Sequence, residues 1–172
     1  MFMKRSPRPL YAEVERATAV TEAGNAVERA YREHHEKLWR ALLLFCGDPE
    51  VASDAVAEAF AQAVRRGDAI RDPGRWVWRV AFQLARGELK GRGRTTALTE
   101  LPVEMPESTV DLVRGLAVLS PKQRAALILH HYAGYSTKET ATIIGSTASA
   151  VGVHLLRARA RLRELLKEHD DA

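Results

Sequence analysis

The chain has 172 residues, enough for one ordinary domain or two small ones, and its 46% hydrophobic content excludes wholesale disorder. Lysine and arginine number 26 against 22 aspartate and glutamate, and this surplus of +4 is too small to identify a partner by itself. A single cysteine, Cys46, excludes an internal disulfide and a cysteine-based zinc site.

Neither a membrane span nor a secretory signal is expected. The apolar runs fall short of the roughly 20 residues that a span needs, and no apolar core follows the basic N-terminus. These features predict a soluble protein of a reducing compartment.

The first half of the chain predicts a tail and three helices. Residues 1–25 are polar and weakly periodic, which predicts a mobile tail with one helical stretch over 11–20. Residues 26–90 have apolar residues at three- and four-residue steps, typical of amphipathic helices. The third helix is expected to start at Asp72-Pro73, an N-cap followed by proline at the first helical position.

The second half predicts a linker followed by more helices. Glycines, Pro102 and Pro106 indicate a linker over 91–109, and residues 110–168 are again helical in pattern. Strand-like alternation and hairpin turns are absent from the sequence. We therefore expect an all-α protein with two small helical domains joined by a flexible linker.

The helix predicted over 73–90 has two distinct faces. One is an apolar stripe, expected to face the core, that contains Trp76, Val77, Val80, Ala81 and Leu84. The opposite side carries basic residues interrupted by two large rings, namely Arg75, Arg79, Phe82, Arg86 and Lys90 with Trp78 at the edge. Rings among arginines suit unpaired nucleic acid, because arginine meets phosphates while rings stack on bases. The groove of a protein partner would suit the rings equally well, and a solvated charged face is the plainer alternative.

Two capping boxes and a glycine turn predict a helix-turn-helix near the C-terminus. Ser120 through Gln123 and Ser136 through Glu139 each have the capping-box pattern, and each precedes a short helix. Gly145 ends the second of these helices, and Thr147 caps a long basic one. Two short elements followed by a longer basic helix are typical of DNA-binding helix-turn-helix proteins.

The long helix is expected to bind the major groove of DNA with its outward face. Arg157 can form a bidentate contact with guanine, and Val153 or Ala150 can contact a thymine methyl. The helix start at Thr147 and Ser149 can hold a phosphate. The alternative is a three-helix bundle that is merely basic outside, but Val153 and Leu156 would then be exposed without a partner.

Several segments together resemble the extracytoplasmic-function (ECF) type of bacterial RNA polymerase sigma factor. Residues 48–60, with Asp54 through Phe60, and then 75–81 are similar to region 2 of that family. Residues 119–136 and 139–159 are similar to region 4. The two regions follow in the family's order, with a linker between them.

The resemblance implies a specificity subunit that has no catalytic chemistry, metal or cofactor. Its expected domains are 26–90, like region 2, and 110–168, like region 4. The implied partners are core RNA polymerase, promoter DNA and, as a further candidate, an anti-sigma factor. The free protein is expected to be a cytoplasmic monomer.

The resemblance also assigns expected roles to individual residues. Contact with the clamp helices of the polymerase β′ subunit is expected from Asp54, Glu58 and Phe60. Contact with the −10 element is expected from Arg75, Trp78, Arg79, Phe82, Gln83, Arg86 and Lys90. Contact with the −35 element is expected from Thr147, Ser149, Ala150, Val153, His154, Arg157 and Arg161, in a region that also sits on the β flap.

Some positions depart from the family pattern. They are Ala57, Phe82, Gln83, Gly87 and the segment Ser149–His154. The substitutions keep the apolar stripes but remove polar contacts, so the promoter sequence does not follow from the family.

Two other classes of protein were considered. A stand-alone helix-turn-helix regulator would use residues 1–90 as a partner-binding or sensing domain, and the basic aromatic face would then be unexplained. A helical enzyme is disfavoured, because His34-His35 and His130-His131 are adjacent pairs that point about 100° apart on a helix and do not chelate. We expect His34 and His131 to be interface or partly buried residues, and Cys46 to be a buried small hydrophobe.

Overall fold

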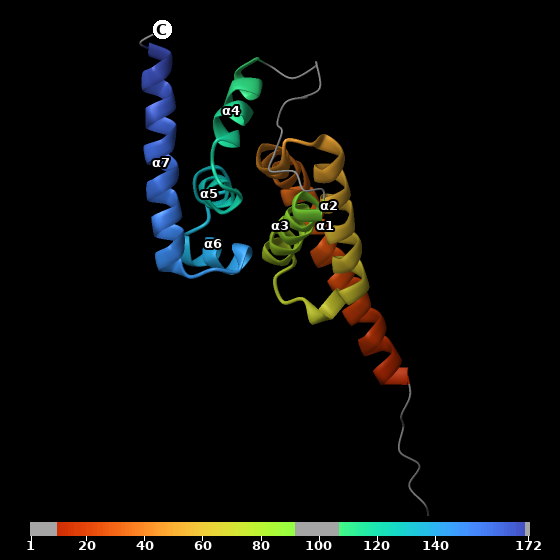
Figure 1. The fold of residues 1–172 in the computed structure, drawn as a ribbon. Coiled ribbons are helices and arrows are strands. Elements are labelled where there is room, and N and C mark those ends of the chain that lie inside the picture. Colours follow the sequence, from red (N-terminus) through yellow and green to blue (C-terminus); the bar gives the residue numbers. More distant parts are fainter. Residues whose placement is uncertain (1–9, 92–106, 171–172) are drawn as a thin grey trace, which may run out of the picture.

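The computed structural model describes residues 10–91 and 107–170, and every regular element in these ranges is helical (Figure 1). The elements are α1 (Leu10–Cys46), α2 (Pro49–Arg66), η1 (Gly67–Ala69), α3 (Pro73–Gly91), α4 (Glu107–Ala117), α5 (Pro121–Leu127), η2 (Ile128–Tyr132), α6 (Thr137–Ile144) and α7 (Ala148–Asp170). The described part of the chain is therefore all-α, as the sequence predicts.

Helix α1 is longer at its N-terminal end than the sequence predicts. It runs unbroken from Leu10 to Cys46, so the boundary expected after residue 25 does not coincide with a break in the helix. Alanine and glutamate are the most frequent residues of this stretch and are good helix formers, and a single interior glycine costs only about 1 kcal/mol. Its N-terminal part extends well beyond α2 and α3 (Figure 1). The rest of the predicted tail, residues 1–9, lies outside the described residues.

Side-chain caps fix the starts of α2 and α3. The Asp48 carboxylate accepts hydrogen bonds from the backbone N–H groups of Glu50 and Val51, at 2.9 and 3.1 Å. The Asp72 carboxylate accepts one from the Arg75 N–H at 3.0 Å. The cap predicted at Asp72 is thus confirmed, and a proline follows each cap at the first helical position.

Small residues let α1, α2 and α3 pack closely as a three-helix bundle. The fully buried alanines of this bundle are Ala41, Ala52, Ala59, Ala63, Ala81 and Ala85. At Gly74, in the first turn of α3, an added Cβ would lie 2.6 Å from Nε2 of His34. A larger residue at this position would displace the His34 ring from its place between α1 and α3. The prediction that His34 is partly buried is confirmed.

The second bundle, α4 to α7, is built from short helices with strong local signals. Both predicted capping boxes are present: the Ser120 and Ser136 hydroxyls accept from the backbone N–H groups of Gln123 and Glu139, which bond back to the cap residues. Gly145 ends α6 with φ +66°, a left-handed conformation that favours glycine. These turns fix the relative directions of α5, α6 and α7.

One arginine is buried inside the second bundle. Arg124 is 1% exposed, and its guanidinium donates to the carbonyl oxygens of Leu116, Ala117 and Leu119. It also donates to the carbonyl of Phe45, the penultimate residue of α1, at 2.7 Å. The side chain therefore satisfies carbonyls at the ends of two helices from different bundles.

The short helix predicted after Ser120 changes geometry part-way. After α5 it continues as the π-helical turn η2, in which the Ala133 N–H donates to the Ile128 carbonyl at 2.9 Å. Gly134, with φ +84°, then turns the chain toward α6. The π turn was not visible in the apolar periodicity, which cannot resolve a single wider turn.

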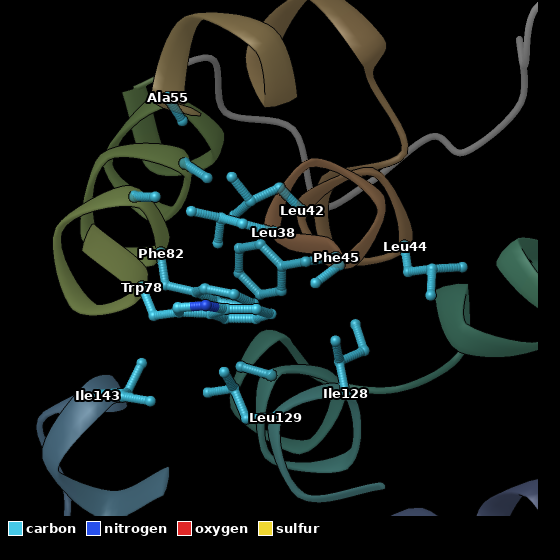
Figure 2. Packing of buried hydrophobic residues seen from close by; sticks show 14 of the residues in the cluster. Leu38, Leu42, Leu44, Phe45, Ala55, Trp78, Phe82, Ile128, Leu129 and Ile143 are labelled. Atoms are coloured by element: carbon cyan, nitrogen blue, oxygen red, sulfur yellow. The ribbon is translucent and has the colours of Figure 1, made fainter. Parts of the chain in front are cut away.

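The two bundles share one hydrophobic core (Figure 2). Phe45, Trp78 and Phe82 lie on the side of the first bundle, and Leu129 and Ile143 lie on the side of the second. The adjacent Cys46 is buried and donates a hydrogen bond to the Asp48 carbonyl, which confirms the prediction that it is a small buried hydrophobe. Burial raises the pKa of its thiol to about 11. The predicted division into two domains stays a prediction, and residues 92–106 of the linker lie outside the described residues.

Candidate nucleic-acid interface

Helix α3 presents a row of polar and basic side chains. Its exposed members are Arg75, Gln83, Arg86 and Lys90, and Arg79 is half-buried beside them. Arg79, Gln83, Arg86 and Lys90 follow one another at steps of three and four residues, so they lie along one line of the helix. The cap at Asp72 sets where this row begins.

The predicted exposure of the two rings on α3 is wrong. Trp78 is 1% exposed and Phe82 is 3% exposed. The Trp78 ring packs edge-on against Tyr135 at 5.4 Å between centroids, and Phe82 lies 5.3 Å from Phe45. The buried side of α3 therefore differs from the apolar stripe that the sequence predicted. The second bundle covers Trp78, and the residues of α3 alone do not indicate this contact.

Trp76, which the sequence analysis assigned to the core stripe, is half-buried, and its ring is accessible beside the row on α3. The guanidinium of Arg66, from the end of α2, lies over its ring at 5.5 Å from the centroid. These two residues line an open groove of about 310 Å³ with Gln62, Arg79 and Gln83. Sequence reasoning missed Gln62 and Arg66, because they belong to α2 and only the packing of α2 on α3 brings them here.

The second candidate surface lies on α7. Its first turn is capped by Thr147, whose hydroxyl accepts from the Ala150 N–H at 3.2 Å. The buried side of the helix carries Val151, Leu155 and Ala158, which recur at steps of three and four residues. The opposite side is open to solvent, with Val153 45% and Leu156 67% exposed.

The predicted −35 residues are gathered on this open side. Thr147, Ser149, Arg157 and Arg161 are exposed, whereas Ala150 and His154 are half-buried. Burial, followed by the charges of Lys122 and Arg157, lowers the pKa of His154 below its ordinary value. This shift favours the neutral ring, in which one nitrogen can accept a hydrogen bond while the other donates.

The outer face of α2 carries two of the three residues predicted to contact the polymerase. Asp54 and Glu58 are exposed. Gln62 and Arg65 both donate to the Glu58 carboxylate at 2.8 Å, and these bonds hold the pKa of Glu58 below its ordinary value. The third assignment fails, because Phe60 is buried, with its ring edge-on to Tyr31 at 5.0 Å. Phe60 fixes α2 against α1 and does not present its ring to a partner.

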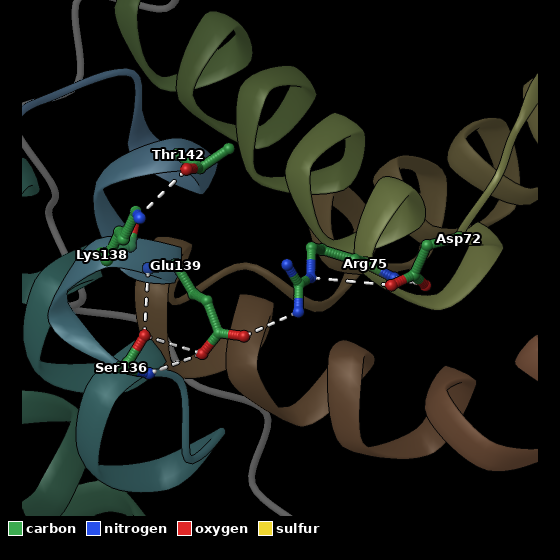
Figure 3. Close-up of polar contacts among 6 residues, drawn as sticks. All are labelled: Asp72, Arg75, Ser136, Lys138, Glu139 and Thr142. Carbon is green, nitrogen blue, oxygen red and sulfur yellow. Dashed lines mark hydrogen bonds and ion pairs between the residues drawn. The ribbon is translucent and has the colours of Figure 1, made fainter.

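Helix α6 lies beside the row on α3 and bonds to it (Figure 3). The Arg75 guanidinium donates to Oε1 of Glu139 at 2.7 Å, while Oε2 of the same carboxylate completes the capping box with Ser136. Arg86 donates to the carbonyl of Ile144, the last residue of α6, at 3.0 Å. Two residues of the row are thus engaged by the second bundle.

The described residues hold no cluster of three or more histidine, cysteine, aspartate or glutamate side chains that could bind a metal ion. His130 and His131 make separate contacts, the former with the Tyr135 carbonyl and the latter with Arg159. His131 is exposed, so of its two predicted placements partial burial is not observed and a place in an interface stays a prediction. Among the same residues, none of the helices is sufficiently long and apolar to span a bilayer.

Comparisons with known proteins show similarities over most of the chain. The family described as "Sigma-70, region 4" matches residues 109–162. The RNA polymerase sigma-E factor of Streptomyces coelicolor is 35% identical over 159 residues, covering 83% of this chain and 87% of that protein. The ECF RNA polymerase sigma factor SigL of Mycobacterium tuberculosis is 32% identical over 170 residues, covering 89% and 96%.

Among solved structures, the chain is similar to the sigma factor RpoE of Bartonella quintana, solved in complex with the anti-sigma factor NepR. The TM-score is 0.68 at 22% identity, covering 81% of this chain and 96% of that one. This likeness supports the all-helical fold.

The chain belongs to the ECF-type sigma factors of the sigma-70 family. It is a sigma factor that directs transcription initiation by RNA polymerase, and the family is non-enzymatic. Core RNA polymerase and promoter DNA are its partners. Membership of this family excludes the alternative that the chain is a stand-alone helix-turn-helix regulator.

Proposed function

We propose that the chain recognises its promoter at two separate places. The exposed side of α7 binds the −35 element as duplex DNA in the major groove. The row on α3 binds the −10 element as its strands separate. Asp54 and Glu58 on α2 contact the clamp helices of the β′ subunit, and the second bundle sits on the β flap.

The exposed side of α7 is the observation that supports this proposal most directly. Val153 and Leu156 leave apolar surface open beside Arg157, on the helix that follows the glycine turn of a helix-turn-helix. Apolar groups suit thymine methyls and arginine suits guanine, so the composition of this face fits a base-pair edge. The start of α7, with the Ser149 N–H in its first turn, is suited to hold a phosphate.

The proposal for the −10 element rests on cations beside an accessible ring. Arg75, Arg79, Arg86 and Lys90 supply charge for the phosphates, and Trp76 supplies a ring on which a base can stack. Trp78 and Phe82 belong to this interface only in an arrangement in which the second bundle has moved away. Gln83 offers a donor and an acceptor on the same row.

The proposed cellular location of the protein follows from its partners. A sigma factor acts where RNA polymerase and chromosomal DNA are, so we place this chain in the cytoplasm as a monomer when free. An anti-sigma factor is a further proposed partner, supported by the related RpoE, which was solved with NepR.

Transcription in vitro tests the whole proposal. Purified protein is added to sigma-free core RNA polymerase of the source organism on genomic fragments, and the transcripts are sequenced. Discrete start sites that share two upstream motifs are expected. Their absence, together with no co-elution of the protein with core enzyme, would refute it.

Substitution in α7 tests the −35 assignment on the promoter so found. Arg157→Ala is expected to weaken specific duplex binding by about 1–3 kcal/mol, because a bidentate base contact is lost. Arg163→Ala, an exposed arginine farther along α7, is the matched control and should leave sequence preference intact. Equal effects of the two variants in a mobility-shift assay would remove Arg157 from the interface.

A further inference from the structure

The C-terminal half of α7 carries basic side chains that neither proposed DNA surface uses. Arg159, Arg163 and Lys167 follow one another at steps of four residues, so they form one line along the helix, here called the α7 basic line, and all three are exposed. In the described part of the chain, none of the three pairs with a carboxylate. Glu164, on the same helix, pairs with Arg161 instead, at 3.1 Å. Like charges four residues apart destabilise a helix, so an anionic partner would relieve this arrangement.

A hydrogen bond to η2 orients the first member of the line. The Arg159 guanidinium donates to Nε2 of His131 at 3.0 Å. Because a guanidinium can only donate, this nitrogen of His131 is an unprotonated acceptor. Burial, followed by the charges of Arg159 and His130, lowers the pKa of His131, which favours the same neutral ring. The bond therefore holds Arg159 in place without neutralising its charge.

The α7 basic line lies away from the DNA that the start of α7 is proposed to bind. At about 100° per residue, Arg163 lies about 120° around the helix from Arg157. At about 1.5 Å per residue, Arg163 and Lys167 lie roughly 22 and 28 Å from Ala148, the first residue of α7. The C-terminal part of α7 extends beyond α5 and α6 (Figure 1). Since the major groove is only about 8.5 Å deep, a helix whose first turns contact base edges has left the groove before it reaches these side chains.

The surface beside the line has the composition of a protein interface. Tyr132 follows His131 on η2, and its side chain is 37% exposed. Nζ of Lys37, from α1, lies 6.0 Å from the centroid of the Tyr132 ring. Tyrosine and arginine are both enriched in interfaces between proteins. An exposed ring beside unpaired arginines therefore favours a protein partner over a DNA backbone.

We propose that the α7 basic line binds an acidic helical face of a partner protein, and that this partner can join the chain while α7 is bound to the −35 element. The second part of this inference rests on the function proposed above. Carboxylates at steps of four residues on a partner helix would match the spacing of the line. Exposed charges of this kind steer association and select the partner, and their effect weakens as salt rises.

Binding of a synthetic helical peptide to the full chain tests the inference. The peptide has glutamate at every fourth position, and a peptide with glutamine at these positions is its control. Fluorescence anisotropy is expected to show binding of the glutamate peptide only, with an affinity that falls as salt is added. Binding of both peptides with equal affinity would overturn the inference.

Substitutions show whether the peptide binds at the line. Arg163→Gln combined with Lys167→Gln is expected to reduce the affinity for the glutamate peptide about 3- to 10-fold, because two exposed ion pairs are lost. Arg29→Gln combined with Arg40→Gln removes the same charge from exposed positions of α1 and should leave the affinity unchanged. Equal losses in the two double variants would mean that net charge alone attracts the peptide, and the inference would fail.

Competition decides between protein and DNA as the occupant of the line. Promoter duplex with the −35 element is added to the labelled peptide complex, and the peptide is expected to stay bound. Displacement by the duplex would assign the line to DNA, and displacement by core polymerase would assign it to the polymerase, so either result would overturn the inference. A chain that binds the peptide at the line but no promoter duplex would instead count against the proposed function.

Discussion

The two bundles of this sigma factor achieve their structure by different means. The first consists of three long helices that approach closely through buried alanines such as Ala52 and Ala59. The second consists mainly of short helices whose directions are fixed by hydrogen bonds, namely two capping boxes and the carbonyls around Arg124. The first bundle therefore depends on fit along whole helices, and the second on a few polar groups. Substitutions of single side chains should expose this difference.

The largest effect is expected at Arg124. Arg124→Met leaves the buried carbonyls of Leu116 and Phe45 without their donor, and we expect a loss of about 3 kcal/mol or more in the free energy of unfolding. Arg114→Met is the control, because its pair with Asp111 is exposed and long at 3.8 Å. Urea unfolding of the full chain measures both. Similar losses for the two variants would show that Arg124 does not hold the second bundle together.

As the pH rises above 9, titration of Cys46 should destabilise the first bundle before titration of Tyr135 weakens the contact between the bundles. Burial raises the pKa of Cys46 from 9.0 to about 11, so between these values the unfolded chain loses its proton first and stability falls as pH rises. The expected loss is about 2–3 kcal/mol. Burial, with a smaller contribution from Asp72, raises the pKa of Tyr135 from 10.0 to about 12, which places its effect at higher pH.

Two variants separate these titrations. Cys46→Ala should abolish the loss of stability between pH 9 and 11 and keep the one between pH 10 and 12. Tyr135→Phe should do the reverse. An unchanged pH profile of urea stability in Cys46→Ala would contradict the assignment.

Overpacking should distinguish the buried side of α2 from its outer side. Ala59→Leu forces a larger side chain between closely packed helices and is expected to cost about 1–3 kcal/mol. Ala57→Leu, two residues away on the exposed side, should change stability by less than about 0.5 kcal/mol. Thermal unfolding of the two variants gives the comparison. Equal costs would mean that close packing does not limit the first bundle.

The smallest effect is expected at a capping box. Ser136→Ala removes the acceptor for the Glu139 N–H and should cost about 1 kcal/mol, whereas Ser136→Asp keeps an acceptor and should cost much less. Hydrogen exchange of the α6 amides is the measurement, since fraying of α6 is local to the second bundle. If aspartate protected α6 no better than alanine, the cap would not be what fixes this helix.

Sequence reasoning succeeded where structure is local. The caps at Asp72, Ser120, Ser136 and Thr147 were predictable, because a cap is a contact between residues two or three positions apart. The buried side of α7 followed from its periodicity for the same reason.

The errors concern contacts between distant segments. Trp78 packs against Tyr135 and Phe82 packs against Phe45, both far away along the chain, and Phe60 packs against Tyr31. The groove beside Trp76 depends on Arg66 of another helix. The spacing of residues within one helix does not indicate any of these contacts.

The π turn at Ile128–Tyr132 makes this part of the helix tolerant of a deletion. A π turn contains one residue more than an α turn, because its N–H groups bond to carbonyls five residues back and not four. Deleting a single residue from this turn would restore an ordinary helical turn and leave Tyr135 close to Trp78. The same deletion in the regular helix α5 would rotate everything that follows by about 100° and move Tyr135 away from Trp78.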